Sequence, residues 1–303
     1  MDPTEIVFTS SGTEAVNLAL LGAARRLPTD APVVTWAAEH QAVLGAVRRL
    51  QLEGRRVEIL GVDPDGRNSE ADLPGAGLVS TSLANNEVGT VQPRVHAPEA
   101  IVHLDACQGP QWLDVDLRGV DLASFSGAKI GAGRGGLLFV RSAVRLEPLQ
   151  YGGPQERGRR AGREDLAAAV AMATALAVCV ARRAERRDAI RPQASRLRRA
   201  LAGAGGRLTG GEPSLPNHAS AVFEGTRGED LLLALDLAGI AASSGSACAS
   251  GSLDPSHVLL AMGLSLEESL SSLRLTAGWS TTGAEIDRAE AVLRSVLPTL
   301  VRA

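Results

Sequence analysis

The chain has 303 residues, which at roughly 150 residues per domain allows about two domains. It is 45% hydrophobic and 21% charged, so it can bury a sizeable core and is expected to fold as a soluble globule. A net charge of −3 and a pI near 6.0 exclude a strongly basic surface. We therefore expect neither a direct nucleic-acid partner nor electrostatic membrane binding.

The lack of a visible targeting signal and the sparse cysteines favour a cytoplasmic location. No stretch approaches ~18 consecutive apolar residues, so no transmembrane helix is expected. The N-terminal MDPTEIVFTS lacks the basic and apolar regions of a signal peptide. The three cysteines, Cys107, Cys179 and Cys248, form no C-x-x-C motif, which argues against a disulfide framework or a structural zinc site.

The first two-thirds of the chain alternates expected strands and helices. Such alternation implies βαβ crossovers and a mostly parallel sheet with helices on both faces, an α/β fold. In chain order we expect a strand at 5–9, a helix at 13–26, a strand at 32–36, a helix at 41–52, and strands at 77–84, 101–104, 121–125 and 136–141.

The pattern changes after a long Ala-rich helix expected at 165–187, whose Arg-rich end suits the helix dipole. The later elements predict a smaller α+β domain, with a boundary near residues 184–190. We therefore expect a large domain at 1–186 and a small C-terminal domain at 187–303. The later elements are helices at 194–204, 229–237 and 284–302 and strands at 218–223 and 273–277.

Lysine is nearly absent from the chain. Of the 31 basic residues, 30 are arginine and one is Lys129. Average usage predicts on the order of fifteen lysines in a chain of this length. A coding bias toward Ala, Arg and Gly explains arginine wherever only a positive charge matters. Arginine cannot be deprotonated in practice, whereas a lysine amine can act as a nucleophile or base, so Lys129 is a candidate for chemistry.

Polar residues follow two of the expected strands. Ser11-Gly12-Thr13 opens a helix, where free backbone N–H groups suit a phosphate. A helix cap would use the same residues, and without other evidence this simpler interpretation is favoured. Asp105 follows the strand at 101–104, at a sheet edge where ligands bind. Its carboxylate could pair with a protonated ring nitrogen of a cofactor or cap the next helix.

Lys129 follows another strand, in Ser126-Gly127-Ala128-Lys129, and so shares this edge with Asp105. A Schiff-base lysine, a partner for a pyridinium nitrogen and a phosphate cradle are what pyridoxal 5'-phosphate needs. The three features together therefore point to this cofactor more strongly than any one of them alone.

The cysteines differ in their surroundings. Cys248 lies in Ser244-Gly245-Ser246-Ala247-Cys248-Ala249-Ser250-Gly251-Ser252, a loop of small residues that favours a partly exposed, reactive thiol. Cys179 lies in the Ala-rich helix and is expected in the core. Cys107 is expected to pack near the site without a catalytic role.

Two further residues are candidates. His40 follows a strand and could stack on a flat cofactor ring or move a proton, although a capping role is favoured when it is taken alone. Arg274 lies in an apolar strand and needs a partner such as a substrate carboxylate. The other histidines, His96, His103, His218 and His257, show no ligand-type spacing and are expected to be structural.

Several motifs resemble the cysteine desulfurase (NifS/IscS) family, which are fold-type I, class V aminotransferase-like transferases. The resemblance runs from the first residues nearly to the last, and the loop with Ser-Gly-Ser-Ala-Cys is specific to one subgroup. The motifs are FTSSGTEAVNLAL, AAEHQAV, LANNEVGTVQP, HLDACQ, SFSGAK, QERGRRAG, SSGSACASGSLDPSHVLLAMGLS and SLRLTAG.

The resemblance implies the activity and a role for each candidate residue. Cys248 would attack the sulfur of bound L-cysteine, become a persulfide, and release L-alanine before passing the sulfur to an acceptor protein. A homodimer is also implied, and the pathway that takes the sulfur stays open among iron–sulfur assembly, tRNA thiolation and specialised thio-metabolite pathways. Around the cofactor ring, Lys129 would hold the cofactor and take the Cα proton, Asp105 would pair with the ring nitrogen, and His40 would stack on the ring. Asn86 and Gln108 would bind near the ring hydroxyl. The phosphate would be bound by Gly12, Thr13 and Ser126, and the substrate carboxylate by Arg274.

The chain departs from the family pattern in three ways. The usual N-terminal segment with an Asn-Ala-Ala-Thr-Thr-type motif is missing from this sequence. Ala128 replaces a phosphate-binding histidine, and Arg163 replaces a threonine that reaches the phosphate of the partner subunit. Two alternatives to a desulfurase therefore stay open: a selenocysteine lyase or other C–S lyase, and a truncated, inactive paralogue that serves as a binding or scaffold protein.

Overall fold

The computed structural model describes the whole chain except residues 1, 71–72, 74, 246–253 and 301–303, so Cys248 lies outside the described residues. The chain divides into two compact units. Unit 1 comprises Met1–Leu60, Ser69–Ala84 and Gln92–Arg183, and unit 2 comprises Gly61–Asn68, Asn85–Val91 and Ala184–Ala303.

Unit 1 is built on a seven-stranded sheet of order β1-β7-β6-β5-β4-β2-β3. The pairs among β3, β2, β4, β5 and β6 are parallel, and β7 is antiparallel to both of its neighbours. The predicted mostly parallel α/β sheet is therefore confirmed. The strands are β1 (Ile6–Thr9), β2 (Val33–Trp36), β3 (Val57–Leu60), β4 (Leu78–Ser82), β5 (Ile101–Asp105), β6 (Leu122–Ser126) and β7 (Gly136–Val140).

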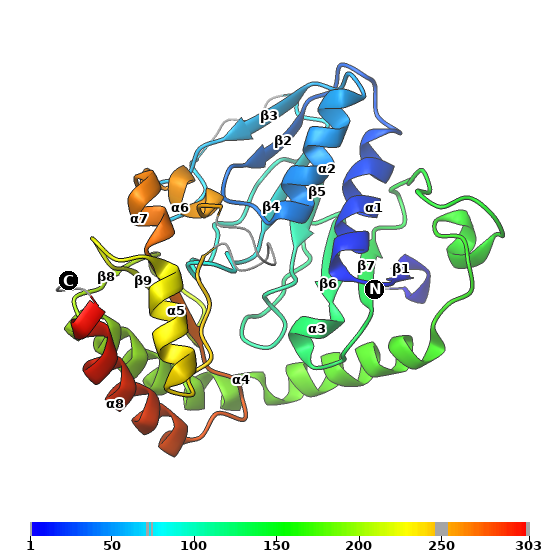
Figure 1. The fold of residues 1–303 in the computed structure, drawn as a ribbon. Coiled ribbons are helices and arrows are strands. Elements are labelled where there is room, and N and C mark those ends of the chain that lie inside the picture. Colours follow the sequence, from blue (N-terminus) through cyan, green and yellow to red (C-terminus); the bar gives the residue numbers. More distant parts are fainter. Residues whose placement is uncertain (1, 71–72, 74, 246–253, 301–303) are drawn as a thin grey trace. The chain divides into compact units, whose positions relative to one another are not determined.

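Helices cover both faces of this sheet. Helices α1 (Gly12–Ala24) and α2 (Gln41–Leu52) lie side by side on one face (Figure 1). The first half of α4 (Leu166–Gly203) packs on the other face through Met172 and Cys179, so Cys179 is a core residue as predicted. Successive residues of β7 serve the two cores in turn, because strand side chains alternate between faces.

The edge strand β1 is covered by side chains of the segment Gln155–Gly158 and of Arg159. The Phe8 N–H donates to Glu156 Oε1 at 2.9 Å, and Arg159 Nη2 donates to the Ile6 carbonyl at 3.1 Å. These bonds occupy backbone groups that an edge strand leaves open to other chains. Burial raises the pKa of Glu156.

Helix α4 is one continuous element, so the prediction of two helices at 165–187 and 194–204 is wrong. Pro192 lies inside it and removes one backbone donor. On either side, Ile190, Ala194 and Leu197 are buried at helical spacing, and this packing offsets the lost hydrogen bond.

The first half of α4 is strongly apolar. By length and composition, an 18-residue window of α4 is sufficient for a membrane span, and 11% of that window is buried in the structure. Leu166, Val170 and Val180 are its most exposed large apolar residues.

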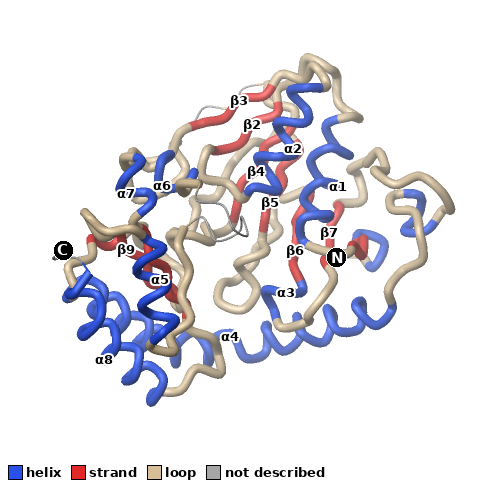
Figure 2. Tube along the Cα trace, viewed as in Figure 1, coloured by secondary structure: helices blue, strands red, loops and turns tan. Residues whose placement is uncertain are grey.

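Unit 2 holds a three-stranded antiparallel sheet of order β10-β9-β8 (Figure 2). Helix α5 contacts both β10 and α8, which builds an α+β unit. The short helices α6 and α7 were not predicted from the sequence, nor was strand β3 of unit 1. The elements are β8 (Arg207–Leu208), β9 (His218–Val222), α5 (Gly228–Leu237), α6 (His257–Ala261), α7 (Leu266–Leu270), β10 (Ser272–Thr276) and α8 (Gly283–Leu300).

Candidate active site

Most of the predicted site residues of unit 1 follow strands that end at one edge of its sheet, here called the carboxyl edge. Strands β2, β4, β5 and β6 are mutually parallel, and β1 runs with them because both β1 and β6 are antiparallel to β7. Such an edge is where open α/β sheets bind ligands. The predicted residues that follow these strands are Gly12 and Thr13 after β1, His40 after β2, Asp105 and Gln108 at and after β5, and Ser126 and Lys129 at and after β6.

Gly136 allows the two ends of β1 and β6 to approach. The register places Gly136 opposite Thr9 on β1 and opposite Ser126 on β6. An added Cβ at Gly136 would lie 2.2 Å from the Ser11 carbonyl oxygen, so no larger residue fits there. The start of α1 and the start of α3 (Gly127–Ile130) are thereby brought together at the carboxyl edge.

The turn before α1 is rigid. Ser11 caps the helix through its Oγ, which accepts from the Glu14 N–H at 3.2 Å, and Thr9 Oγ1 donates to the Ser11 carbonyl at 2.9 Å. The turn therefore caps the helix, as the simpler interpretation of its sequence predicted. The N–H groups of Gly12 and Thr13 precede the first intrahelical bonds, so the turn still offers donors to an anion.

An ion pair between Arg160 and Glu14 holds this turn, and it was not predicted from the sequence. Arg160 Nε donates to Glu14 Oε1 at 2.9 Å, and both side chains are less than one-fifth exposed. The Ser10 N–H donates to Glu14 Oε2 at 2.7 Å. Burial pushes the pKa of Glu14 upward, but the hydrogen bonds from Arg160 and Ser10 outweigh it and lower the pKa. Arg160 thus links the Gln-Glu-Arg-Gly-Arg-Arg segment to the start of α1.

Asp105 and Cys107 meet the start of α1 on the same edge. Asp105 is buried, and its Oδ1 accepts from the Cys107 N–H at 3.0 Å. Burial and the Asp105 charge raise the pKa of the Cys107 thiol well above its usual range, while the Lys129 charge opposes this shift. The Cys107 thiol therefore feels the charges of both Asp105 and Lys129, the two residues that follow neighbouring strands at this edge.

The remaining candidates of unit 1 flank this group. Lys129 is an exposed residue of α3, and its carbonyl accepts from Gln111 Nε2. Ser126 begins α3 without using its hydroxyl as a cap, so that hydroxyl stays available to a ligand. His40 caps α2, with Nδ1 accepting from the Ala42 N–H at 3.1 Å. This bond fixes the ring plane and, in the neutral ring, leaves the proton on Nε2.

His103 lies inside the sheet, in agreement with its predicted structural role. Its Nδ1 lies 2.8 Å from Ser80 Oγ and its Nε2 lies 2.9 Å from Ser124 Oγ. Burial lowers the pKa of His103 to about 4, although the Asp105 charge acts in the opposite direction. The ring is therefore neutral at physiological pH and holds three strands together.

Two other predicted residues meet inside unit 2. Arg274 of β10 and Asn86 are both half-buried, and Arg274 Nη1 donates to the Asn86 carbonyl at 3.0 Å. The next residue, Glu87, is a buried acid that the sequence analysis missed. Its only signal in the sequence is its place directly after two asparagines that follow a strand.

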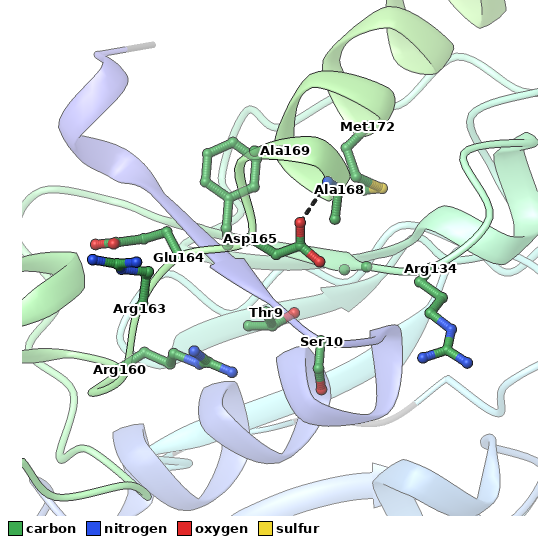
Figure 3. A pocket seen from close by; sticks show the side chains of 13 residues that line it. Thr9, Ser10, Arg134, Arg160, Arg163, Glu164, Asp165, Ala168, Ala169 and Met172 are labelled. Carbon is green, nitrogen blue, oxygen red and sulfur yellow. Dashed lines mark hydrogen bonds between the residues drawn. The ribbon is translucent and has the colours of Figure 1, made fainter.

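Arg163 lies beside a cavity of about 320 Å³ between β1 and the start of α4 (Figure 3). Asp165 begins that helix by accepting from the Ala168 N–H at 3.0 Å. Arg134 and Arg160 also line the cavity. Arg163 itself is exposed.

The residues of the carboxyl edge fit pyridoxal 5'-phosphate. An added Cβ at Gly12 would lie 2.9 Å from both Cys107 Sγ and Ser126 Cβ, so a side chain there would fill the cradle. The cradle offers backbone N–H and hydroxyl donors to a phosphate, the buried Asp105 suits a protonated ring nitrogen, and Lys129 supplies an amine for the aldehyde.

Known proteins resemble this chain over most of its length. The aminotransferase class-V family model matches residues 1–289. The chain belongs to the aminotransferase class-V family. The cysteine desulfurase of Gluconacetobacter diazotrophicus is 39% identical over 98% of this chain and 78% of that protein. A solved NifS-like protein has a TM-score of 0.90 at 30% identity, covering 99% of this chain and 84% of that one. SspA, solved in complex with cysteine, has a TM-score of 0.74 at 29% identity, covering 91% of this chain and 82% of that one.

These likenesses confirm the family predicted from the sequence motifs, the cysteine desulfurases of fold type I. They also confirm an enzyme that depends on pyridoxal phosphate.

Proposed function

We propose that this chain is a cysteine desulfurase that converts L-cysteine to L-alanine. In this reaction the C–S bond of the substrate breaks, and its sulfur forms a new S–S bond with the Cys248 thiol. The electron pair of the broken C–S bond stays on the substrate carbon, which takes up one proton and becomes the methyl group of alanine. The proton that the Cys248 thiol loses balances this uptake, and Cys248 is left as a persulfide. The observation that carries the proposal is the meeting of Gly12, Asp105, Cys107 and Lys129 at the carboxyl edge of a class-V fold.

The cofactor, when bound, withdraws electrons from the substrate Cα so that a proton can leave or return there. Lys129 holds the cofactor and carries that proton, because it is the one basic residue of the site whose amine can be neutral. Asp105 stabilises the positive charge on the ring nitrogen, and its burial strengthens that interaction. His40 is oriented by its bond to Ala42 and would stack on the cofactor ring.

The phosphate end is held by the start of α1. The N–H groups of Gly12 and Thr13, the Thr13 hydroxyl and the free Ser126 hydroxyl supply the donors. Asn86 and Gln108 hydrogen-bond near the ring hydroxyl. Arg163 contributes a positive charge to the phosphate of a partner subunit.

The substrate end is held by Arg274. One of its N–H groups is occupied by the Asn86 carbonyl, which fixes the guanidinium plane, and the other donors remain for the substrate carboxylate. Cys248 then receives the sulfur. A thiolate is required for this attack, and the Cys107 thiol, whose pKa is raised by burial, is poorly suited to compete with it.

The proposal also covers the location, the oligomeric state and the sulfur acceptor of the enzyme. The enzyme acts in the cytoplasm as a homodimer and passes its sulfur to an acceptor protein, as in iron–sulfur assembly. Unit 1 carries most of the cofactor site and unit 2 carries the cysteine. The segments Gly61–Asn68 and Asn85–Val91, which a single division at residue 186 would assign to the cofactor domain, belong to unit 2.

The proposal is tested on purified protein supplied with pyridoxal phosphate. Addition of L-cysteine should yield L-alanine, and mass spectrometry should find one extra sulfur on Cys248. Pyruvate in place of alanine would identify a different C–S lyase, and a rate much higher with L-selenocysteine would identify a selenocysteine lyase. A protein that shows no cofactor absorbance and no turnover would be the scaffold alternative.

A further inference from the structure

Unit 2 contains a buried acid, Glu87, to which the proposed reaction assigns no role. The residue is 8% exposed, and Ser256 Oγ donates to its Oε2 at 2.5 Å. The same Ser256 oxygen accepts from the Leu259 N–H at 3.1 Å and so caps α6. Glu87 therefore fixes the residue at which α6 begins.

Gly245 lies against the same carboxyl group. An added Cβ at Gly245 would lie 3.0 Å from Glu87 Oε2 and 2.9 Å from Ser256 Cβ. The Gly245 N–H donates to Ser272 Oγ at 2.9 Å, which holds this residue against β10. A glycine is required here because any side chain would displace the acid or the serine.

Gly245 and Ser256 are the two ends of the stretch of sequence that contains Cys248. Ten residues separate them, and Cys248 is the third residue after Gly245. Gly245 and Ser256 therefore lie next to each other, and the Glu87 carboxyl group contacts both of them.

The backbone around Glu87 is held from several sides. The Asn85 Oδ1 accepts from the Glu87 N–H at 2.7 Å, and the Glu87 carbonyl lies 2.9 Å from His218 Nε2. The neighbouring Asn86 carbonyl accepts from Arg274. The position of the carboxyl group is therefore tied to the arginine that we assign to the substrate carboxylate.

A buried acid is expensive to keep if it serves only packing. Burial raises the pKa of Glu87, while the Ser256 hydroxyl and the charges of His257 and Arg274 favour its ionised form. An apolar side chain at this position would avoid the desolvation cost. The Glu87 carboxyl group contacts both Gly245 and Ser256, and its backbone is held next to Arg274. A role in positioning these residues explains the buried acid better than packing does.

We propose that Glu87 is a positioning residue for the sulfur-transfer step, holding Gly245 and Ser256 in fixed relation to Arg274. The inference rests on the proposed function, since it concerns delivery of sulfur to Cys248. Glu87 acts through Ser256 and Gly245 and does not itself exchange a proton with the substrate. The step it serves is the approach of the Cys248 thiol to the substrate sulfur.

The test separates early and late steps in Glu87→Ala and Glu87→Gln. Rapid mixing with L-cysteine follows the spectral change of the bound cofactor, and quenched samples give the rate of persulfide formation on Cys248. We expect Glu87→Ala to slow persulfide formation by about 10-fold to 100-fold, because the buried hydrogen bond between the Ser256 hydroxyl and the Glu87 carboxyl group is lost. The early spectral change should stay within about twofold. Glu87→Gln should recover most of the rate, since its amide oxygen accepts from Ser256.

Glu268→Ala is the matched control. Glu268 accepts from the Ser265 N–H at 2.7 Å and completes the cap of α7 in the same unit, without contact to Gly245 or Ser256. It should lower stability and leave persulfide formation unchanged. A Glu87→Ala variant that slows both steps equally, or neither, would overturn the inference, as would a Gln variant no better than Ala.

A second readout does not depend on turnover. In cofactor-free protein, the rate at which iodoacetamide alkylates Cys248 should change in Glu87→Ala and stay unchanged in Glu268→Ala. An unchanged rate in Glu87→Ala would count against the inference. If wild-type protein places no sulfur on Cys248, the proposed function fails by itself, and the alkylation result still decides whether Glu87 positions the segment.

Discussion

Gly12 packs so closely against Cys107 that an added Cβ would lie 2.9 Å from the Cys107 sulfur. The backbone of Gly12 is ordinary helix, so glycine is needed here for space and not for an unusual conformation. The close approach brings the first N–H groups of α1 to the ends of β5 and β6. The start of α1, which we propose binds the phosphate, is thereby brought close to Cys107 and Ser126.

We predict that Gly12→Ala weakens cofactor binding by about 10-fold or more, because overpacking of this kind costs on the order of 1–3 kcal/mol. The measurement is a titration of the apoprotein with pyridoxal phosphate. Gly45→Ala is the control: Gly45 lies in α2 with nothing within 4 Å of its added Cβ, so alanine should stabilise the helix by up to ~1 kcal/mol. Equal affinities in both variants would contradict the close-packing argument.

Lys129→Arg should abolish both cofactor absorbance and turnover. Guanidinium keeps the positive charge but cannot provide a neutral amine to hold the cofactor or carry a proton. We expect alanine formation to fall at least ~1,000-fold. As a control, Arg48→Lys adds an amine to the exposed side of α2 and should leave the rate unchanged. Wild-type turnover in Lys129→Arg would show that another group holds the cofactor.

The sequence predicted well those features that depend on local pattern. Helix α2 has the predicted bounds, and the six predicted strands of the large sheet lie within one or two residues of the expected ranges, whereas β3 was not predicted. Lys129 and Asp105 were found because the ends of parallel strands meet at a known edge. Helix α4 was predicted as two pieces because the Ala-rich pattern ends at an Arg-rich stretch, and only the burial on both sides of Pro192 shows why the helix continues.

Features that depend on distant partners were not predictable from one sequence. Glu14 is held by Arg160, and Glu87 contacts Ser256, which lies 169 positions away. Nothing in the residues around Glu87 signals a partner at that distance. The roles assigned to Asn86 and Gln108 came from family resemblance alone and stay predictions, as does the role of Cys248.

Cys248→Ser should bind the cofactor and respond to L-cysteine, yet carry no persulfide. A hydroxyl cannot form the S–S bond that accepts the sulfur. Mass spectrometry of peptides after addition of cysteine is the measurement. Cys107→Ser is the matched control, and it should retain the extra sulfur on Cys248, because burial keeps the Cys107 thiol protonated. Extra sulfur on Cys107 or Cys179 of wild-type protein would move the nucleophile.

Stability should decrease with acidification, in part through His103. Burial lowers its pKa to about 4 in the folded protein, from an ordinary value of 6.5. The unfolded chain therefore binds more protons between these values, and stability is lost as pH falls through this window. From about pH 7.5 to about pH 5 this group accounts for a loss of about 2 kcal/mol.

The test of this effect is urea unfolding of wild type and His103→Asn at both pH values. The variant should lose less stability on acidification, whatever its stability at neutral pH. His218, whose pKa burial lowers to about 3, contributes in the same direction and remains in both proteins. An identical pH dependence in the two proteins would show that His103 is not buried as a neutral ring.

The last prediction concerns how this chain binds phosphate with Ala128 where the family resemblance implies a histidine. Alanine offers no side-chain donor, while Arg163 supplies a permanent charge and several donors where the resemblance implies a threonine. Arg163 is exposed in the isolated chain, at a cavity that Arg134 and Arg160 also line. In the proposed homodimer its guanidinium would be directed at the partner subunit's phosphate and compensate for Ala128.

Cofactor affinity of Arg163→Ala and Arg163→Thr decides this point. Compensation predicts that both variants bind pyridoxal phosphate about 10-fold more weakly, the loss expected for a charge-assisted hydrogen bond, and that adding Ala128→His to the Thr variant restores most of it. Arg48→Ala, which removes an exposed charge from α2, should have no effect. Light scattering on each variant checks that the dimer persists. Unchanged affinity in both Arg163 variants would leave the phosphate to Thr13, Ser126 and the start of α1, and Arg163 would then be a solvated residue of an arginine-rich surface.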